Sequence, residues 1–152
     1  MMARHFVGDD TFVYLHGDLA YGERILPDFF RASEARDSSC LDLLTDFGDT
    51  DEEAMKVRTD SRGRLVESNK SIPVSEAAGE WTGIAIVHDP RVVFDEIDRH
   101  LMTRGLDDYD TAAFTSLAAS GREVRCIPTN GQQWKEIDTV EDLEAARQTF
   151  AP

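Results

Sequence analysis

Cysteine and long apolar runs are both scarce in this sequence of 152 residues. The two cysteines, Cys40 and Cys126, lie far apart, which argues against a disulfide framework and predicts two reduced thiols in the core. No apolar run approaches the roughly 18 residues of a membrane span, and no secretory signal is visible. We therefore predict a soluble, cytoplasmic protein.

Positive charge is also in short supply. Lys and Arg total 16 against 30 Asp and Glu, which gives a formal net charge of −14. Such acidity suits neither a nucleic-acid groove nor an anionic membrane surface, so neither is predicted as a partner. Two interpretations of the acidity remain open: an ordinary solvated surface, or carboxylates that hold divalent cations.

The chain contains no internal repeat and no low-complexity tract, and its length fits one domain with a real core. Residues 1–10 have no clear period and are predicted to be a lead-in to a single domain over residues 11–152. Apolar runs predict five strands, at 11–16, 38–47, 81–88, 123–128 and 134–137. Helical spacing of apolar residues predicts four helices, at 23–35, 90–104, 111–119 and 140–150.

A β-hairpin is predicted between the second and third of these strands. Two short alternating runs, 55–59 and 64–68, flank a turn that contains Gly63. Strands separated by helices are typical of an α/β domain. We therefore predict a mixed, mostly parallel sheet with flanking helices and an inserted hairpin.

The first predicted strand stops abruptly, in the stretch FVYLHGDLAYG, at Gly17 and Asp18. In α/β sheets ligands bind beyond the carboxyl ends of strands. A glycine there lets a phosphate approach the backbone, and an aspartate can ligate Mg²⁺. The alternative is a simple turn in which Asp18 caps the following helix.

A second strand also ends at an aspartate, Asp138, in the segment WKEIDTVEDLEAA. Mg²⁺ in phosphate chemistry usually binds one or two protein carboxylates, so Asp18 and Asp138 in one crevice would form such a site. The alternative is that Asp138 or Thr139 caps the last helix, with Glu141 or Asp142 completing a capping box.

Four segments together carry a resemblance to a known family: HGDLAYG, MKVRTDSRGRLVESNK, GEWTGIAIV and WKEIDTVEDLEAA. Their order and approximate spacing resemble those of nucleotidyltransferases that activate sugar phosphates and phosphocholine-like phosphates. The chain is most similar to the CTP:phosphocholine and phosphonate cytidylyltransferases, whose members end in a W-x-E-I-D-T-x-E-D-L type segment. The resemblance covers residues 11–150 and implies a partial nucleotide-diphospho-sugar transferase fold, which is Rossmann-like.

This resemblance implies roles for particular residues. Asp18 and Asp138 correspond to the Mg²⁺ ligands, and Lys70 corresponds to a catalytic lysine that contacts the phosphate of the acceptor. Gly83 matches a glycine that lets the backbone pass close to the acceptor, and Glu80 is a candidate for polar contact with it.

Four more residues are weaker candidates. Gly17 is assigned to the nucleotide side of the site, and Lys56 to the acceptor, although strand lysines are usually solvated. Trp81 and Trp134 could form the walls of a pocket for a trimethylammonium group through cation–π contacts. The alternative for both tryptophans is packing, in the core or along the hairpin edge.

The family's glycine-rich loop, of the form L-A-A-G-x-G-x-R, and the lysine of its P-K pair are not found before His16. The resemblance is therefore to the C-terminal, acceptor-side half only. Without the nucleotide-binding half, strand 11–16 is expected to be an unpaired edge. We expect a homodimer built around residues 6–16, or a partner chain that covers this strand. The rival expectation is that residues 1–10 fold back over it.

The leading hypothesis is Mg²⁺-dependent transfer of a nucleotidyl group, from CTP or another nucleoside triphosphate, with release of pyrophosphate. The acceptor would be a small phosphate or phosphonate, such as phosphocholine, an alkylphosphonate or a sugar phosphate. The alternative is a non-catalytic remnant, or a partner-dependent binding module, of the same fold. A metal-dependent hydrolase has little support, because the four histidines, at positions 5, 16, 88 and 100, show no ligand spacing.

Overall fold

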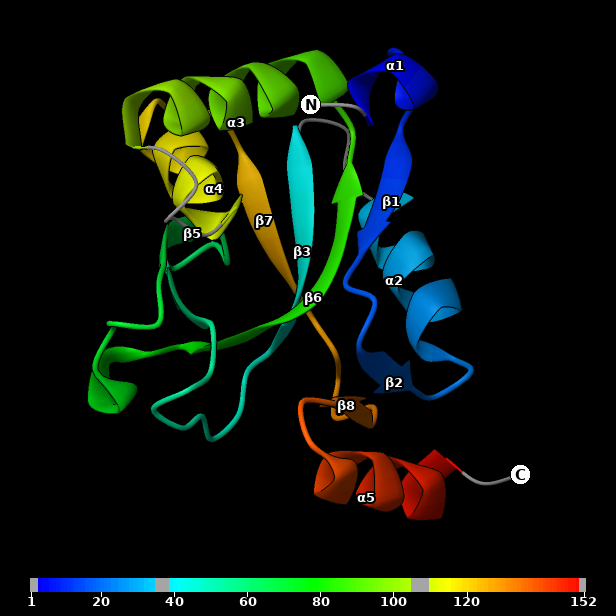
Figure 1. Cartoon of the computed structure of the whole chain (residues 1–152). Coiled ribbons are helices and arrows are strands. Elements are labelled where there is room, and N and C mark those ends of the chain that lie inside the picture. Colours follow the sequence, from blue (N-terminus) through cyan, green and yellow to red (C-terminus); the bar gives the residue numbers. More distant parts are fainter. Residues whose placement is uncertain (1–2, 35–38, 105–109, 151–152) are drawn as a thin grey trace.

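The computed structural model describes residues 3–34, 39–104 and 110–150. They form a six-stranded mixed sheet with helices on both faces, and a small two-stranded sheet lies beyond one end (Figure 1). The strands of the main sheet are β1 (Phe12–Leu15), β3 (Leu41–Asp46), β4 (Lys56–Thr59), β5 (Leu65–Ser68), β6 (Gly79–Val87) and β7 (Val124–Pro128).

The long strand β6 organises the main sheet. It pairs antiparallel with β1, β3 and β4, and β3 pairs in parallel with β7 on its other side. The strands β1, β3, β4 and β7 run in one direction, whereas β6 and β5 run in the other. The predicted mixed sheet and the inserted hairpin, formed by β4 and β5, are therefore confirmed. The sheet is mostly antiparallel rather than mostly parallel as predicted, because β6 runs against all three of its neighbours and, among the described strands, only β3 and β7 pair in parallel.

The helices are α1 (Arg4–Val7), α2 (Ile25–Glu34), α3 (Pro90–Arg104), α4 (Asp110–Ala119) and α5 (Val140–Phe150), with a short 3₁₀ turn, η1 (Val74–Glu76). Helix α2 covers one face of the main sheet and α3 and α4 cover the other, whereas α5 packs on the small sheet of β2 and β8 (Figure 1). The four predicted helices are thus confirmed, α3 and α5 with the predicted bounds and α2 and α4 with starts that differ by one or two residues. Among the described helices, none has both the length and the apolarity that crossing a bilayer requires.

Two apolar clusters fill the spaces between sheet and helices. On one face, α2 packs on β3, β6 and β7 through Ile25, Phe29, Leu44, Ile84, Ile86 and Ile127. On the other face, α3 and α4 pack through a larger cluster that includes Leu43, Trp81, Ala85, Val93, Phe114 and Leu117. Alternate residues of β6 point to opposite faces, as the period of a strand requires. The continuous apolar run of β6 is explained by this burial on both faces.

Both cysteines are free and buried, as predicted. Burial raises the pKa of the Cys40 thiol to about 11 and that of Cys126 to about 12. A thiol with such a pKa stays protonated at neutral pH and is a poor nucleophile. The two residues therefore contribute packing rather than chemistry.

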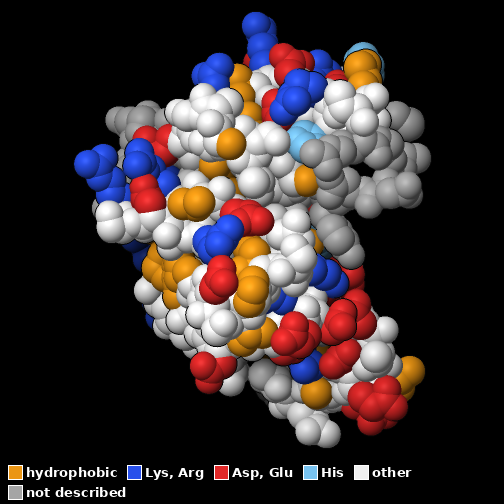
Figure 2. Space-filling view, turned by 90° about the vertical axis from the view of Figure 1, so that its left-hand side faces the viewer, with side chains coloured by type: hydrophobic (Ala, Val, Ile, Leu, Met, Phe, Trp, Pro, Cys, Tyr) orange, Lys and Arg blue, Asp and Glu red, His pale blue; other side chains and the backbone are white. Residues whose placement is uncertain are grey.

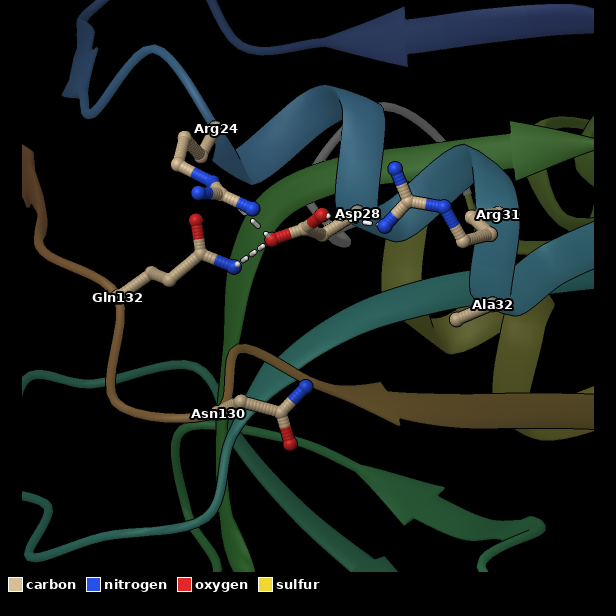
Figure 3. A pocket seen from close by; sticks show the side chains of 6 residues that line it. All are labelled: Arg24, Asp28, Arg31, Ala32, Asn130 and Gln132. Carbon is tan, nitrogen blue, oxygen red and sulfur yellow. Dashed lines mark hydrogen bonds and ion pairs between the residues drawn. The ribbon is translucent and has the colours of Figure 1, made fainter.

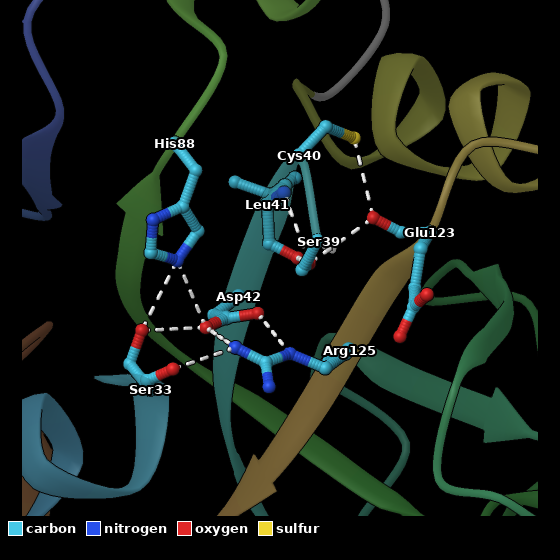
Figure 4. Close-up of polar contacts among 8 residues, drawn as sticks. All are labelled: Ser33, Ser39, Cys40, Leu41, Asp42, His88, Glu123 and Arg125. Carbon is cyan, nitrogen blue, oxygen red and sulfur yellow. Dashed lines mark hydrogen bonds and ion pairs between the residues drawn. The ribbon is translucent and has the colours of Figure 1, made fainter. Parts of the chain in front are cut away.

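A buried ion pair joins β3 to β7 and is hydrogen-bonded to α2 (Figure 4). The Nε of Arg125 on β7 donates to Asp42 Oδ1 on β3 at 2.7 Å, and its Nη2 donates to the carbonyl oxygen of Ser33 at 3.0 Å. The Ser33 hydroxyl donates to Asp42 Oδ2 at 2.6 Å, where His88 Nε2 also lies, at 3.0 Å. Burial alone would raise the pKa of Asp42, but these hydrogen bonds lower it below its ordinary value.

Strand β1 lies at an edge of the sheet, as expected, since among the described strands it pairs with β6 alone. Two of its side chains are partly exposed, Val13 at 38% and Leu15 at 41%, and Phe30 of α2 is exposed at 37%. The described part of the lead-in does not pair with this edge. Helix α1 is instead bound to α3 through ion pairs of Arg4.

One short strand, β2 (Leu19–Tyr21), and its pairing with β8 (Trp134–Glu136) were not predicted. The chain forms β2 directly after Asp18, and β2 pairs antiparallel with β8 in a separate sheet. The residues 134–137 were predicted as a strand, but the three residues of β2 are too few to show a period. This small sheet positions the candidate site.

Candidate functional site

The pairing of β2 with β8 brings the two predicted metal ligands to one place. Leu19 lies opposite Glu136, and the main-chain N–H of Ile137 donates to the carbonyl oxygen of Asp18 at 2.8 Å. Asp18 therefore lies beside the segment 136–138, which ends in Asp138. The two aspartates flank the same junction, where β1 leads into β2 and β8 leads into α5 (Figure 1).

Three side chains at this junction present donor atoms close together. One ring nitrogen of His16 and one carboxylate oxygen each from Asp18 and Glu136 lie within 4.8 Å of one another. His16 is half-buried, and the two carboxylates reach the surface. Such a set of one nitrogen and two oxygens can hold a divalent cation. The four histidines show no ligand spacing along the sequence, but the fold brings one of them, His16, beside two carboxylates.

Two more predicted residues act on the same carboxylate. The pKa of Glu136 is raised, first by desolvation and then by the negative charges of Asp138 and Asp18. The positive charges of His16 and Lys70 act in the opposite direction but do not cancel this effect. The charges of Asp18, Asp138 and Lys70 thus all act on Glu136.

Neither aspartate caps a helix. Strand β2 separates Asp18 from α2, so the capping alternative for Asp18 is wrong. At the start of α5, the amide of Asp142 donates to the Thr139 hydroxyl oxygen at 3.1 Å, and Asp142 Oδ2 accepts from the Thr139 amide at 3.1 Å. This reciprocal capping box is formed by Thr139 and Asp142. Asp138 is therefore not the N-cap of α5.

The imidazole of His16 is held by its surroundings. Its main-chain N–H donates to the carbonyl oxygen of Gly83 at 3.0 Å, and its ring lies edge-on to Trp81 with centroids 4.9 Å apart. Gly83 has φ of +79°, and a Cβ built on it would lie 2.9 Å from the His16 ring. Gly83 is thus needed both for its backbone conformation and for the close approach of His16.

Asp110, at the start of α4, also lies near the His16 ring. Its Oδ2 is 3.8 Å from His16 Nε2 and accepts a hydrogen bond of 2.8 Å from the Tyr14 hydroxyl. The pKa of His16 is raised, chiefly by its interaction with Asp110, and Asp18 and Glu136 add to this effect. The pKa of Tyr14 is raised well above its usual range by burial and by Asp110.

Glu80, the predicted polar contact to the acceptor, begins a second group of carboxylates. It lies opposite Asp46 on β3 and opposite Lys56 on β4. Its pKa is raised to about 7, first by burial and then by the charges of Asp51, Asp46 and Glu136, against the opposing charge of Lys56. Near neutral pH this carboxyl group can therefore donate or accept a hydrogen bond.

Lys56 is fully buried, and its ammonium group is occupied by the preceding loop. The Nζ donates to the carbonyl oxygens of Asp51 at 3.0 Å, Glu52 at 2.8 Å and Ala54 at 3.3 Å. An ammonium has three protons, so all are used. A contact with the acceptor would require exchange of one of these bonds, and this role of Lys56 stays a prediction.

The two tryptophans differ in their surroundings. Trp81 is 4% exposed and packs edge-on against Phe114, and its indole N–H donates to the carbonyl oxygen of Ile84 at 2.9 Å. This is core packing, and it leaves little ring surface for a ligand. Trp134 is half-buried and donates from Nε1 to Asp46 Oδ2 at 3.0 Å. Trp134 thus connects the small sheet to the second group of carboxylates.

Gly17 is not required by the packing of this chain. A Cβ built on it would meet nothing within 4 Å, in contrast to Gly83. Space beside Gly17 is compatible with its predicted place on the nucleotide side of the site. That role remains a prediction.

An open hollow lies between α2 and the loop that precedes β8 (Figure 3). Two arginines in it, Arg24 and Arg31, would attract an anion, but both lie beside Asp28, at 3.9 Å and 2.7 Å. Gln132 also donates to the Asp28 carboxylate at 3.1 Å. The positive charge is thus partly neutralised within the hollow, and none of the predicted site residues lines it.

The Ser33, Asp42 and His88 cluster of Figure 4 is not a catalytic triad. In a triad the serine and the aspartate bond to opposite nitrogens of the histidine ring. Here both Ser33 Oγ and Asp42 Oδ2 lie 3.0 Å from the same nitrogen, His88 Nε2. The cluster stabilises the contact of α2 with the sheet.

The surface charge is uneven. In the face shown in Figure 2, Asp and Glu side chains gather toward the lower end, at the height of α5 in Figure 1. The candidate site lies toward this same end, next to β8 (Figure 1). A cation or a cationic group is therefore attracted to this end of the molecule.

The sheet order, the strand directions and the helices on both faces make a Rossmann-like fold, and solved structures of nucleotidyltransferases share it. The sequence itself matches no protein-family model and no curated protein. One similar structure is described as a glucose-1-phosphate thymidylyltransferase from Bacillus anthracis, with a TM-score of 0.76 and 19% identity. It is matched over 97% of this chain and 57% of that chain.

Two further structures are similar. The inositol-1-phosphate CTP transferase from T. maritima has a TM-score of 0.72 at 16% identity, over 99% of this chain and 62% of that one. The nucleoside-diphosphate-sugar pyrophosphorylase from Vibrio cholerae RC9 has a TM-score of 0.68 at 12% identity, over 97% and 60%. The chain thus spans about three fifths of the length of these structures. Identities this low show the fold alone.

Proposed function

We propose that this chain is the acceptor-side part of a nucleotidyltransferase. The reaction joins the nucleotidyl group of CTP, or of another nucleoside triphosphate, to a small phosphate or phosphonate and releases pyrophosphate. The observation that carries the proposal is the convergence of Asp18, Glu136 and Asp138 at one junction of a nucleotidyltransferase fold.

The residues at this junction fit the Mg²⁺ ion that such chemistry uses. Carboxylate oxygens are its preferred protein ligands, and Asp18, Glu136 and the neighbouring Asp138 supply them. When bound, the ion would neutralise charge on the phosphate groups. Asp18 and Asp138 would hold it, and His16 presents a nitrogen to the same place.

The other residues of the chain would position the acceptor. Lys70, whose charge reaches Glu136, would bind the acceptor's phosphate or phosphonate. An oxygen of that group attacks the α-phosphorus of the triphosphate, and the bond from this phosphorus to the bridging oxygen breaks. Pyrophosphate leaves with that oxygen. No side-chain nucleophile is required, because catalysis of this kind depends on positioning and electrostatics.

The second group of carboxylates suggests the class of acceptor. Glu80, Asp46 and Asp51 lie close enough for their charges to interact. Such a group favours an acceptor with a cationic end, such as phosphocholine, over a sugar phosphate, whose sugar end carries no charge. Trp134, which is bonded to Asp46, would lie beside that cationic end.

The rest of the enzyme would join at β1. The chain spans 57% to 62% of the similar structures named above, and β1 has one unpaired edge with Val13 and Leu15 partly exposed. Further polypeptide that carries a glycine-rich loop would pair there and supply the N–H groups that hold the triphosphate. A second copy of this chain is the alternative occupant of the same edge.

A second candidate function is a non-catalytic binding module with the same fold. The same partial coverage of the similar structures favours it. A binding module needs Lys70 and the acceptor side, but it has no need of the paired aspartates. Loss of Asp18 and Asp138 therefore discriminates the two functions.

The test is release of pyrophosphate from CTP with Mg²⁺, at enzyme concentrations close to those of the substrate. The acceptors would be phosphocholine, an alkylphosphonate and a sugar phosphate. We expect slow release that depends on acceptor and is lost in Asp18→Asn and Asp138→Asn, but not in Asp10→Asn, an exposed control. Binding of an acceptor without any release would support the binding module instead.

A further inference from the structure

The candidate cation site contains a nitrogen donor. Two of its three donor groups, Asp18 and Glu136, are carboxylates, and the third is the imidazole of His16. Mg²⁺ binds oxygen ligands, whereas imidazole suits first-row transition ions. The donor set therefore combines nitrogen with oxygen, unlike a magnesium site that consists of carboxylates alone.

The spacing of the donors is close to what one ion requires. Ligand bonds of about 2.1 Å place opposite ligands about 4.2 Å apart. The three donor atoms lie within 4.8 Å of one another. Three ligands that are each about 2.1 Å from one ion can be at most about 3.6 Å apart in all three pairs, so the donor atoms would approach one another by up to about 1.2 Å on binding. Rotation of the two surface carboxylates can supply this movement while His16 keeps its position.

The His16 ring is already in place for such a role. The close contact with Gly83 and the edge-on contact with Trp81 restrict its position. The Asp110 carboxylate near His16 Nε2 is itself fixed by the Tyr14 hydroxyl. A carboxylate beside a metal-binding imidazole typically orients the ring and increases its basicity.

The charge around the site also favours a cation. Asp138 adds a third negative charge to those of Asp18 and Glu136, and this charge acts on Glu136. Lys70 and His16 offset only part of this charge. A divalent ion would relieve the repulsion among the carboxylates.

We propose that His16 is a metal ligand, and that His16, Asp18 and Glu136 together form a site for a first-row transition ion such as Co²⁺, with Mn²⁺ as a weaker occupant. The proposal deepens the proposed function, because it names the class of ion at the same site. Asp110 is a positioning residue that acts through His16.

Transition ions bind more tightly than Mg²⁺ at many sites, so the diagnostic result is the dependence on His16. The experiment titrates the full chain with Co²⁺, followed by visible absorption, and with Mg²⁺, followed by calorimetry, in the absence of nucleotide. His16→Gln is expected to lower Co²⁺ affinity by about tenfold or more and to leave Mg²⁺ affinity nearly unchanged. His5→Gln is the matched control, and Asp18→Asn should weaken the binding of both ions.

Equal Co²⁺ affinity in wild type and His16→Gln would overturn the proposal. If the variant does not fold, as judged by circular dichroism, pulsed electron paramagnetic resonance on the Mn²⁺-loaded wild type decides. We expect the spectrum to show coupling of Mn²⁺ to an imidazole nitrogen, and we expect the same coupling in His5→Gln. Absence of this coupling in the wild type overturns the proposal. Because no nucleotide is present, these results stand whether or not the chain transfers nucleotidyl groups.

Discussion

The main-chain N–H of Ile137 donates a hydrogen bond of 2.8 Å to the carbonyl oxygen of Asp18. This bond joins two segments that lie near opposite ends of the chain. It extends the register in which Leu19 faces Glu136, and it places the strand end at Asp18 beside the one at Asp138. The candidate site therefore depends on the small sheet formed by β2 and β8.

The first prediction concerns the contact between Gly83 and His16. We expect Gly83→Ala to lower the free energy of unfolding by about 1–3 kcal/mol through its positive φ, with an added cost because the new methyl group meets the His16 ring. Gly121→Ala is the matched control, since Gly121 also has a positive φ, +83°, but has open space around it. Urea unfolding measures the free energy of unfolding of both variants. Equal losses in the two variants would show that the contact of the new methyl group with His16 has no cost.

The buried ion pair gives a second prediction. Arg125→Met leaves the Asp42 carboxylate buried without its partner, and we expect it to lower the free energy of unfolding by about 3–5 kcal/mol. Arg99→Met, which removes an exposed pair with Glu96, should have a far smaller effect. Chemical denaturation of both variants checks this, and similar losses would contradict the account.

The same pair predicts a response to acid. The pKa of Asp42 is lower in the folded chain than its ordinary value of 3.8. Its contribution to stability is therefore present above pH 3.8 and is lost as the pH falls from there through the folded pKa. Wild type should thus lose stability below this pH more steeply than Asp42→Asn, as unfolding curves at several acidic pH values will show.

Glu80 predicts a pH dependence of opposite sign. Its pKa is about 7 in the folded chain against 4.5 for an ordinary glutamate, so the folded state holds this proton more tightly. The resulting stability is fully present below pH 4.5 and is lost as the pH rises toward 7. Glu80→Gln should flatten this part of the profile, whereas Glu144→Gln, at an exposed site, should not. A slope that survives in Glu80→Gln would assign the effect to another group.

The exposed edge of β1 predicts association. We expect the chain to be larger than a monomer in light scattering at micromolar concentration, or to bind a partner chain, because β1 pairs with β6 alone among the strands that the structure describes. Val13→Lys with Leu15→Lys should abolish association, and Val66→Lys, at an exposed apolar residue of β5, should not. A stable monomer in which the amides of Phe12 and Tyr14 are protected from hydrogen exchange would contradict the prediction.

Much of the fold could be predicted from the sequence because its elements have strong local signals. The β6 run is apolar on both faces, and α2 and α3 show clear helical spacing. The hairpin was signalled by a glycine turn between two alternating runs. In contrast, β2 could not be predicted, since three residues carry no period and only pairing with β8 makes them a strand.

The site could be predicted in part. Asp18 and Asp138 each follow an apolar strand, which is a local signal. In an extended segment, residues two apart face the same side. This rule could have added Glu136, two residues before Asp138. It does not cover His16, because Gly17 and Asp18 form a turn. Asp110 had no such signal, because its approach to His16 depends on how α4 packs against the sheet.

Acceptor recognition was harder to predict. The burial of Trp81 depends on α4, which supplies Phe114. The occupation of Lys56 depends on the conformation of the loop before it, which supplies three carbonyl oxygens. Neither is visible in the spacing of residues. Both residues were weaker candidates than Glu80, which the structure surrounds with other carboxylates.

The most direct test of the account is a crystal structure of the chain soaked with Mn²⁺, with the anomalous difference map used to locate the ion. The account predicts a peak at the junction of β1, β2 and β8, within about 2.3 Å of an Asp18 oxygen and in reach of Glu136 or Asp138. The peak should disappear in Asp18→Asn and persist in Asp10→Asn. A map with no peak at this junction, or with its peaks only elsewhere on the acidic surface, would contradict the claim that these carboxylates form a site for metal-dependent phosphate chemistry.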